Sequence, residues 1–195
     1  MPVTTLRRAI RVCGIVVLTL ASVQVAGSAA GHAQDYAAIL GASDRTEADL
    51  QNDKRRDALK LLAFTGPKTG WQVLDMGAGA GYSTELMARA VGPTGKIWGQ
   101  NDRAVEKFDA RLKTPAMGNA VSLVRPYNDP AAGLPPLDLI TFFFAYHDTT
   151  FMDVDRARMN KALFAALKPG GILIVADHAA RPEDGATVGK TYHRI

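Results

Sequence analysis

Residues 73–84, with the sequence VLDMGAGAGYST, constrain the fold of this chain more than any other stretch. A short apolar segment carries the acid Asp75 near its end, and three alternating glycines follow, at Gly77, Gly79 and Gly81. Beyond the glycines, two hydroxyl residues open a segment with helical periodicity. This order predicts a buried strand, a tight turn and then a helix.

The alternating glycines have a physical purpose. A chain that reverses from a strand into a helix within a few residues needs positive φ angles, which glycine adopts without steric cost. A turn without side chains also leaves room for a ligand beside the backbone. Asp75, at the carboxyl end of the strand, can receive an ammonium or a hydroxyl group there. The spacing Gly-x-Gly-x-Gly differs from the Gly-x-Gly-x-x-Gly of dinucleotide binders. The alternative is a glycine-rich turn that binds no ligand.

Two hydrophobic residues, an acid, another hydrophobic residue and Gly-x-Gly-x-Gly together resemble motif I of the class I S-adenosylmethionine-dependent methyltransferases. The phrase Leu-Lys-Pro-Gly-Gly at residues 167–171 is frequent before a strand in the same class and supports the resemblance independently. The resemblance runs from about residue 44 to the end. It implies S-adenosyl-L-methionine (SAM) as cofactor, bound by the acid and glycines of the motif: Asp75, Gly77, Gly79 and Gly81.

Apolar and helical segments alternate along the rest of the chain. Besides the strand before the glycine turn, apolar runs predict strands at residues 95–100, 120–124, 137–145 and 172–176. Helical patterns cover residues 43–64, 83–91, 104–112 and 152–167, with a cap expected at Asp44. The proline-rich residues 125–136 predict a loop from the sheet edge back to its centre. The fold class is therefore α/β, a doubly wound Rossmann-like parallel sheet of about five strands.

Two terminal segments need separate treatment. The resemblance implies a C-terminal antiparallel hairpin, which does not follow here, so residues 34–195 are expected to form a C-terminally incomplete methyltransferase-like domain. Residues 1–33 have the basic, apolar and small-residue parts of a signal peptide, with cleavage expected after Ala30 or Ala33. An uncleaved anchor is the alternative, but about 15 apolar residues are few for a membrane span. We expect an exported protein, in the periplasm or cell envelope, without a stable membrane anchor.

The charge and cysteine content limit the partners. Three arginines of the leader contribute three units to the formal net charge of +4, so the remaining chain carries a net charge of about +1 (4 − 3). We therefore expect a small-molecule acceptor and no nucleic acid. The single cysteine, Cys13, lies in the leader, so the mature chain would have no thiol for a disulfide, a nucleophile or a metal site. The acceptor and the oligomeric state cannot be read from the sequence.

The resemblance also implies contacts to the nucleoside part of the cofactor. In this class an acid at the end of the second strand accepts hydrogen bonds from both ribose hydroxyls, and the matching residue here is Asn101, followed by Asp102. An amide lacks the charge assistance of a carboxylate, so Asn101→Asp is expected to tighten binding. Asp129 or Asn128 would meet the adenine amino group, although turn formation explains both residues equally well.

Polar residues gather where the fourth and fifth predicted strands end, at Tyr146-His147-Asp148 and Asp177-His178. Ligands of open α/β sheets bind at this edge. Methyl transfer depends mainly on alignment, and a base that removes a proton from the acceptor assists it. An ordinary histidine pKa of about 6.5 suits that task. We predict His147 as the base, with Tyr146 or Asp148 positioning it or the substrate; the alternative is that these residues only cap the following helix.

Other functions remain open. Asp148, Asp177 and His178 resemble the metal site of catechol-type O-methyltransferases, but their loose spacing does not single out a metal, and we expect none. The leading hypothesis is a methyltransferase that acts on an unidentified small molecule. SAM is made in the cytoplasm, which conflicts with export. The alternatives are a non-catalytic protein that binds a nucleoside or small ligand, and an inactive remnant of the fold.

Overall fold

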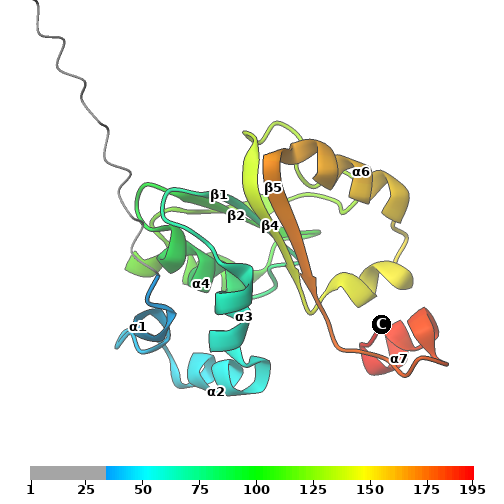
Figure 1. The fold of residues 1–195 in the computed structure, drawn as a ribbon, viewed down its shortest axis with the longest axis horizontal. Coiled ribbons are helices and arrows are strands. Elements are labelled where there is room, and N and C mark those ends of the chain that lie inside the picture. Colours follow the sequence, from blue (N-terminus) through cyan, green and yellow to red (C-terminus); the bar gives the residue numbers. More distant parts are fainter. Residues whose placement is uncertain (1–33) are drawn as a thin grey trace, which may run out of the picture. The chain divides into compact units, whose positions relative to one another are not determined.

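The computed structural model describes residues 34–195, so the predicted signal peptide lies outside the described part of the chain. One parallel sheet runs through this part (Figure 1). Its strands lie in the order β3-β2-β1-β4-β5, and they are β1 (Gln72–Met76), β2 (Lys96–Asn101), β3 (Ala120–Val124), β4 (Leu137–Phe143) and β5 (Leu167–Ala176). This arrangement confirms the predicted α/β fold with a five-stranded Rossmann-like sheet.

Helices precede and connect the strands. The α-helices are α1 (Tyr36–Leu40), α2 (Glu47–Arg56), α3 (Ala58–Thr65), α4 (Tyr82–Val91), α5 (Glu106–Arg111), α6 (Arg156–Ala166) and α7 (Gly189–Tyr192). Three short 3₁₀ segments are η1 (Pro115–Met117), η2 (Tyr146–Thr150) and η3 (Gly185–Val188). None of these described helices is long and apolar enough to cross a membrane.

Successive residues of the central strands enter two different hydrophobic clusters, because side chains alternate between the faces of a sheet. Val73 and Leu139 pack with residues of α3, α4 and α5, whereas Leu74 and Ile140 pack with residues of α6. All four side chains are fully buried. Both faces of the sheet are covered, which explains why β4 is apolar almost throughout.

The helical region before the glycine turn differs from the prediction in two ways. Asp57, with a φ of 48°, divides it into α2 and α3. The predicted cap at Asp44 is wrong, because Thr46 caps α2 in a reciprocal pair with Asp49, in which each side chain accepts the backbone N–H of the other. Asp44 instead forms an ion pair with Arg89 at 3.0 Å.

The region around α6 also differs from the prediction. The helix expected over residues 152–167 begins later, at Arg156, because Asp155 caps it; residues 151–155 form a turn and an irregular segment between η2 and α6. The Lys-Pro-Gly-Gly sequence expected to separate this helix from a strand at residues 172–176 belongs to β5 itself. The pairing register of β4 with β5 shifts between Leu137 and Leu139, which marks an irregularity that accommodates the additional residues.

The two edges of the sheet have different surroundings. The loop of residues 125–136 leaves the edge strand β3 and passes β2 and β1 to reach β4, as predicted. At the other edge, within residues 34–195, β5 pairs with β4 alone. Its side chains Ile172, Leu173 and Val175 are 41%, 37% and 44% exposed. An apolar strand edge of this kind offers a surface on which another strand can pair.

Candidate active site

The glycine loop, residues 77–81, connects β1 to α4 and has positive φ angles of 61°, 55° and 85° at Gly77, Gly79 and Gly81. A Cβ atom at Gly77 would lie 2.8 Å from the side chain of Ala145, and one at Gly81 would lie 2.8 Å from that of Phe108. A Cβ at Gly79 would have no atom within 4 Å. Packing therefore requires two of the glycines, whereas Gly79 faces open space that a ligand can enter.

Asp75 stabilises the start of the glycine loop through side-chain hydrogen bonds. Its side chain is fully buried and accepts hydrogen bonds from the hydroxyls of Ser83, Thr84 and Thr141 at 2.9, 2.7 and 2.8 Å. Burial raises the pKa of Asp75, and the three hydroxyl donors act in the opposite direction. Asp75 is thus bonded within the protein, and its contact with a cofactor stays a prediction. The hydroxyl groups that donate to Asp75 belong to the protein itself, and these hydrogen bonds connect β1 to α4 and β4.

Two amide side chains from the end of β2 hold the loop from the other side. The backbone N–H of Gly77 donates to Oε1 of Gln100 at 3.1 Å, and that of Gly79 donates to Oδ1 of Asn101 at 2.8 Å. Nδ2 of Asn101 donates back to the carbonyl of Gly79 at 3.2 Å. Asn101 thus uses both polar atoms on the loop, not on an outside group. The acid that follows it, Asp102, has an exposed side chain.

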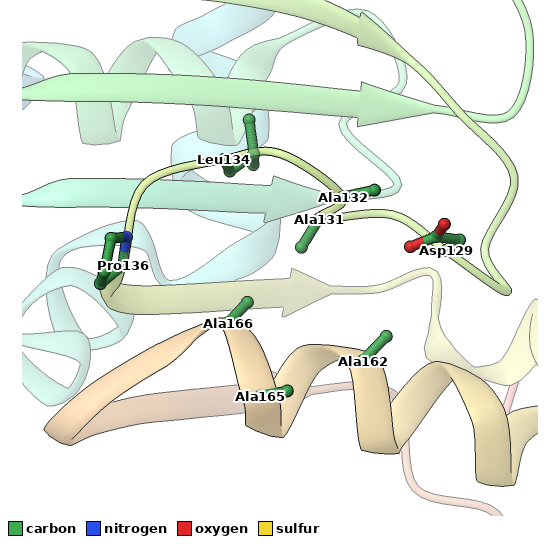
Figure 2. A pocket seen from close by; sticks show the side chains of 8 residues that line it. All are labelled: Asp129, Ala131, Ala132, Leu134, Pro136, Ala162, Ala165 and Ala166. Atoms are coloured by element: carbon green, nitrogen blue, oxygen red, sulfur yellow. The ribbon is translucent and has the colours of Figure 1, made fainter.

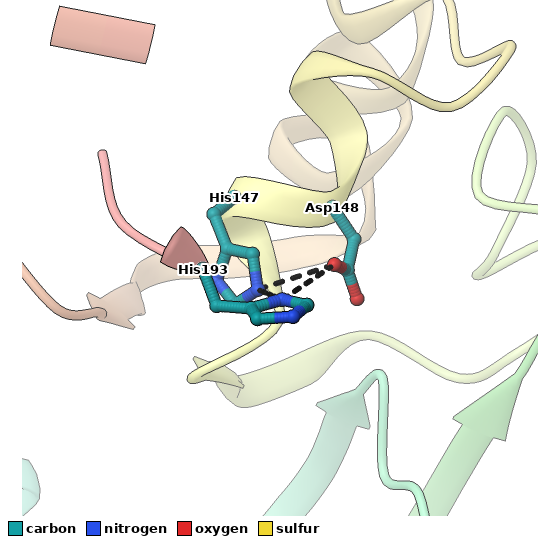
Figure 3. Close-up of side chains that lie close together, drawn as sticks. All are labelled: His147, Asp148 and His193. Atoms are coloured by element: carbon teal, nitrogen blue, oxygen red, sulfur yellow. Dashed lines mark hydrogen bonds and ion pairs between the residues drawn. The ribbon is translucent and has the colours of Figure 1, made fainter. Parts of the chain in front are cut away.

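The predicted base lies in a cluster of ionisable side chains at the carboxyl ends of β4 and β5. Nδ1 of His147 lies 2.9 and 3.0 Å from the two carboxylate oxygens of Asp177, and the backbone N–H of His147 donates to Asp177 at 2.8 Å. Nε2 of His147 lies 3.1 Å from Nδ1 of His193 and 3.1 Å from Oδ1 of Asp148 (Figure 3). His147 is only 4% exposed. The structure therefore brings together His147, Asp148 and Asp177 from the two predicted strand ends and adds His193.

A cavity of about 300 Å³ opens beside this cluster, lined by Arg55, Arg56, Phe144, His147, Asp148, His178 and His193. The guanidinium of Arg56 lies 5.0 Å from the ring centre of Tyr82 and 4.9 Å from that of Phe144. Burial, and next the charge of Arg55, lower the pKa of Arg56. Two arginines give this cavity a positive wall, which favours a molecule with a negatively charged or electron-rich group.

Comparison with known proteins identifies the family. The model of the protein-L-isoaspartate(D-aspartate) O-methyltransferase (PCMT) family matches residues 56–181, more than half of the chain. The chain belongs to the PCMT family. The match includes the glycine loop, His147, Asp148 and Asp177, and it confirms the resemblance to class I SAM-dependent methyltransferases.

Individual relatives agree with this assignment. A protein-L-isoaspartate O-methyltransferase of Ignicoccus hospitalis is 31% identical over 110 residues, which cover 55% of this chain and 47% of the relative. A ubiquinone/menaquinone biosynthesis C-methyltransferase of Burkholderia multivorans is 29% identical over 146 residues, covering 66% and 54%. The solved SAM-dependent methyltransferase from Aquifex aeolicus is 25% identical with a TM-score of 0.56, covering 65% of this chain and 67% of that one. The chain spans about half the length of the curated relatives it matches.

Three other residues that the sequence analysis named do not join the cluster around His147. The ring of Tyr146 packs edge-on against Phe142 at 5.3 Å and does not join the cluster around His147. Asp129 is exposed on the loop that precedes β4. It lines a separate cavity of about 310 Å³ against α6 (Figure 2), whose lining includes no residue of the glycine loop. His178 lines the cavity beside His147, but its backbone N–H, not its ring, bonds Asp177.

His193 is the member of the cluster that the sequence did not indicate. It lies 46 residues after His147 and outside the region that matches the PCMT family. No motif or strand end marks it, because it follows the short helix α7. Gln100 was missed for a similar reason, since a glutamine near the end of a strand gives no sign of which backbone group it will bond.

Proposed function

We propose that the protein is a methyltransferase that transfers the methyl group of SAM to a small-molecule acceptor. The observation that carries this proposal is the glycine loop of a PCMT-family chain, held with Gly79 toward open space. A side chain there would fill the space, so the residue present fits the close approach of a cofactor. Directly after the loop, the first N–H groups of α4 lack partners within the helix and favour a carboxylate such as that of SAM.

The residues divide into those that would hold the cofactor and those that shape its site. Gly79, the first turn of α4 and the exposed carboxylate of Asp102 would hold it, with Asp102 at the ribose position in place of Asn101. Gln100, Asn101 and Asp75 keep the loop in its conformation. When bound, SAM supplies a methyl group on a sulfonium, which is already electrophilic.

The cavity beside His147 would hold the acceptor, and its two arginines favour an acceptor with a negative charge. In the neutral ring whose Nδ1–H donates to the carboxylate of Asp177, Nε2 carries the lone pair. Nε2 is therefore the atom through which His147 acts. Of the predicted catalytic residues, we retain His147 and Asp148 and leave out Tyr146, which is partly buried and packs against the core.

Calorimetric titration of the full chain with SAM, its demethylated product and NAD tests the proposal. We expect the first two to bind and NAD not to bind, and labelled methyl groups to appear on members of a panel of small carboxylates and hydroxyl compounds. Binding of SAM with no transfer to any acceptor would favour the non-catalytic alternative. Absence of SAM binding would contradict both the activity and the cofactor.

A substitution at Asn101 tests whether residue 101 or Asp102 contacts the ribose of the cofactor. From sequence, Asn101→Asp is expected to tighten SAM binding, but the hydrogen bonds of Asn101 support the opposite expectation. A carboxylate cannot donate to the carbonyl of Gly79, so one hydrogen bond of the loop is lost and two acceptors face each other. A loss of about 1 kcal/mol corresponds to roughly fivefold weaker binding, measured by the same titration. Tighter binding would show that residue 101 contacts the ribose after all.

Export remains a prediction that concerns residues outside the described part of the chain. Every residue of the proposed site lies between residues 55 and 193, so cleavage after Ala30 or Ala33 would remove none of them. We propose that the mature chain acts as a methyltransferase outside the cytoplasm, on an acceptor and with a cofactor supply still to be identified.

A further inference from the structure

We propose that His147, Asp148 and His193 bind a divalent first-row transition-metal ion such as Zn²⁺. These three residues come from η2 and from the end of α7, two segments far apart in the sequence, and Figure 3 shows their polar atoms turned toward one another. Two imidazoles and a carboxylate form a donor set that suits Zn²⁺, Co²⁺ or Fe²⁺ better than Mg²⁺ or Ca²⁺. An ion bound to Nε2 of His147 uses the lone pair that the free ring would offer as a base, so in the metal-bound protein His147 acts as a ligand and not as the base. The inference concerns the site of the proposed function but does not depend on methyl transfer.

The distances among the donor atoms match those around a small metal ion. Bonds of about 2.0–2.2 Å at tetrahedral or octahedral angles place neighbouring donor atoms roughly 3.0–3.5 Å apart. Nε2 of His147 lies 3.1 Å from both Nδ1 of His193 and Oδ1 of Asp148. The remaining pair, His193 and Asp148, is wider at 4.0 Å. The side chain of His193 is 67% exposed, so it has room to close that gap.

The neutral form of His147 suits a cation at Nε2. Because Nδ1 donates its hydrogen to Asp177, a neutral His147 presents a lone pair at Nε2. That lone pair faces a carboxylate oxygen of Asp148 at 3.1 Å, and two acceptors at this distance repel each other. A cation between them turns the repulsion into two favourable contacts. His193 supplies a second imidazole to the same point.

Asp177 makes His147 suitable as a ligand. A metal-binding histidine commonly donates its other ring N–H to a carboxylate, which fixes the ring orientation and increases the basicity of the ligating nitrogen. Asp177 accepts from both the ring and the backbone N–H of His147, and its side chain is 4% exposed. A buried, hydrogen-bonded carboxylate therefore holds the imidazole so that Nε2 points to His193 and Asp148.

The last residues of the chain hold His193 in place by packing and backbone hydrogen bonds. The N–H of Ile195 donates to the carbonyl of His178 at 2.9 Å, and that of Ala180 donates to the carbonyl of Ile195 at 3.0 Å. A side chain at Gly189 would collide with Thr150 of η2, so the glycine allows α7 to pack directly on η2. His193 is thus positioned by the fold and not by chance exposure.

The surroundings leave the ion accessible. Three protein ligands leave at least one coordination position free, as in catalytic zinc sites, and the cavity of about 300 Å³ adjoins these ligands. The charges of Arg55 and Arg56 oppose a cation, and the two carboxylates of Asp148 and Asp177 offset them. The guanidinium of Arg56 lies against the rings of Tyr82 and Phe144. The ion and Arg56 would together favour an anionic acceptor in that cavity.

Titration of the full chain with Co²⁺, whose visible absorption reports coordination by nitrogen and oxygen, tests the proposal. All proteins carry Cys13→Ser, so that the only thiol of the chain does not compete. After treatment with a chelator, we expect one equivalent of Co²⁺ to bind and Zn²⁺ to displace it. His193→Ala and Asp148→Asn should each weaken binding by more than about tenfold.

The matched control is His178→Ala, which removes a histidine from the same cavity but not from the ligand set. It should bind Co²⁺ like the parent. Because His193 is largely exposed, its replacement should preserve folding, and circular dichroism of each variant checks this. No saturable binding, binding that survives His193→Ala, or equal loss in His178→Ala would each overturn the site. SAM titration of His193→Ala, expected to match the parent, tests the proposed cofactor function separately.

Discussion

Replacing His147 with alanine is expected to lower the turnover of methyl transfer by about 10²-fold or more, with SAM affinity close to that of the parent. His147 holds the central position of the cluster: Asp177 bonds one ring nitrogen, and His193 and Asp148 adjoin the other. Removal of the ring takes away the group that acts on the acceptor, whether alone or as a metal ligand. The glycine loop has no contact with this ring, so cofactor binding should persist.

Initial rates with labelled SAM and calorimetric affinities measure this effect. Thr149→Ala is the matched control, because Thr149 is buried on the same 3₁₀ turn and its hydroxyl donates to the carbonyl of Tyr146 at 2.7 Å. Thr149→Ala should perturb the 3₁₀ turn but leave the side chains of the cluster around His147 in place. It should therefore reduce the rate of methyl transfer far less than His147→Ala does. If His147→Ala transfers methyl groups at the parental rate, catalysis depends on alignment alone, which suffices for an acceptor that is already deprotonated.

Replacing Gly79 with valine is expected to abolish SAM binding, with an affinity at least 10²-fold below that of the parent. The φ of Gly79 is 55°, in the left-handed region where a β-branched residue is strained. The new side chain would also fill the open space beside the loop. Strain by itself would lower the free energy of unfolding by roughly 1–2 kcal/mol. The loss of SAM binding, and not the loss of stability, is the effect that tests the loop as a cofactor site.

A second glycine distinguishes strain from loss of the ligand space. Gly66 has a φ of 59° and equally open surroundings, but it ends α3 ahead of β1, at the opposite end of the strand from the glycine loop. Gly66→Val should therefore shift the melting temperature about as much as Gly79→Val and leave SAM binding unchanged. If Gly79→Val binds SAM as tightly as Gly66→Val does, the loop is only a turn.

The sheet could be predicted from the sequence because its signals are local. The third strand was placed at the residues that form β3, and the glycine turn and the long loop before β4 were recognised from their own composition. The predicted ends of helices and strands were wrong where more than one residue could cap the helix or where the strand length depended on pairing. Asp44 and Thr46 are both good caps, and tertiary pairing of Asp44 with Arg89 decides between them. The length of β5 depended on pairing with β4, which no local pattern reports.

The site could be predicted only where topology brings residues together. Parallel strands share one carboxyl edge, so His147 and Asp177 were expected near each other, and they are hydrogen-bonded. Side chains that reach the site from elsewhere were missed, namely Arg56 from α2 and His193 from the end of α7. Asp75 and Asn101 were expected to contact a ligand, but each has its polar atoms bonded within the protein, and that choice depends on distances between segments.

The hydrogen bonds around the glycine loop bear on the thermodynamics of ligand binding. Gln100 and Asn101 hold its N–H groups, and Arg111 donates to the carbonyl of Ala80 while pairing with Glu85 and Asp49. A loop fixed in this way has little conformational freedom to lose when a molecule settles against Gly79. The entropy of association would then come mainly from released water and from the ligand's own torsions, so that rigid nucleoside analogues gain more from this protein than flexible ones do.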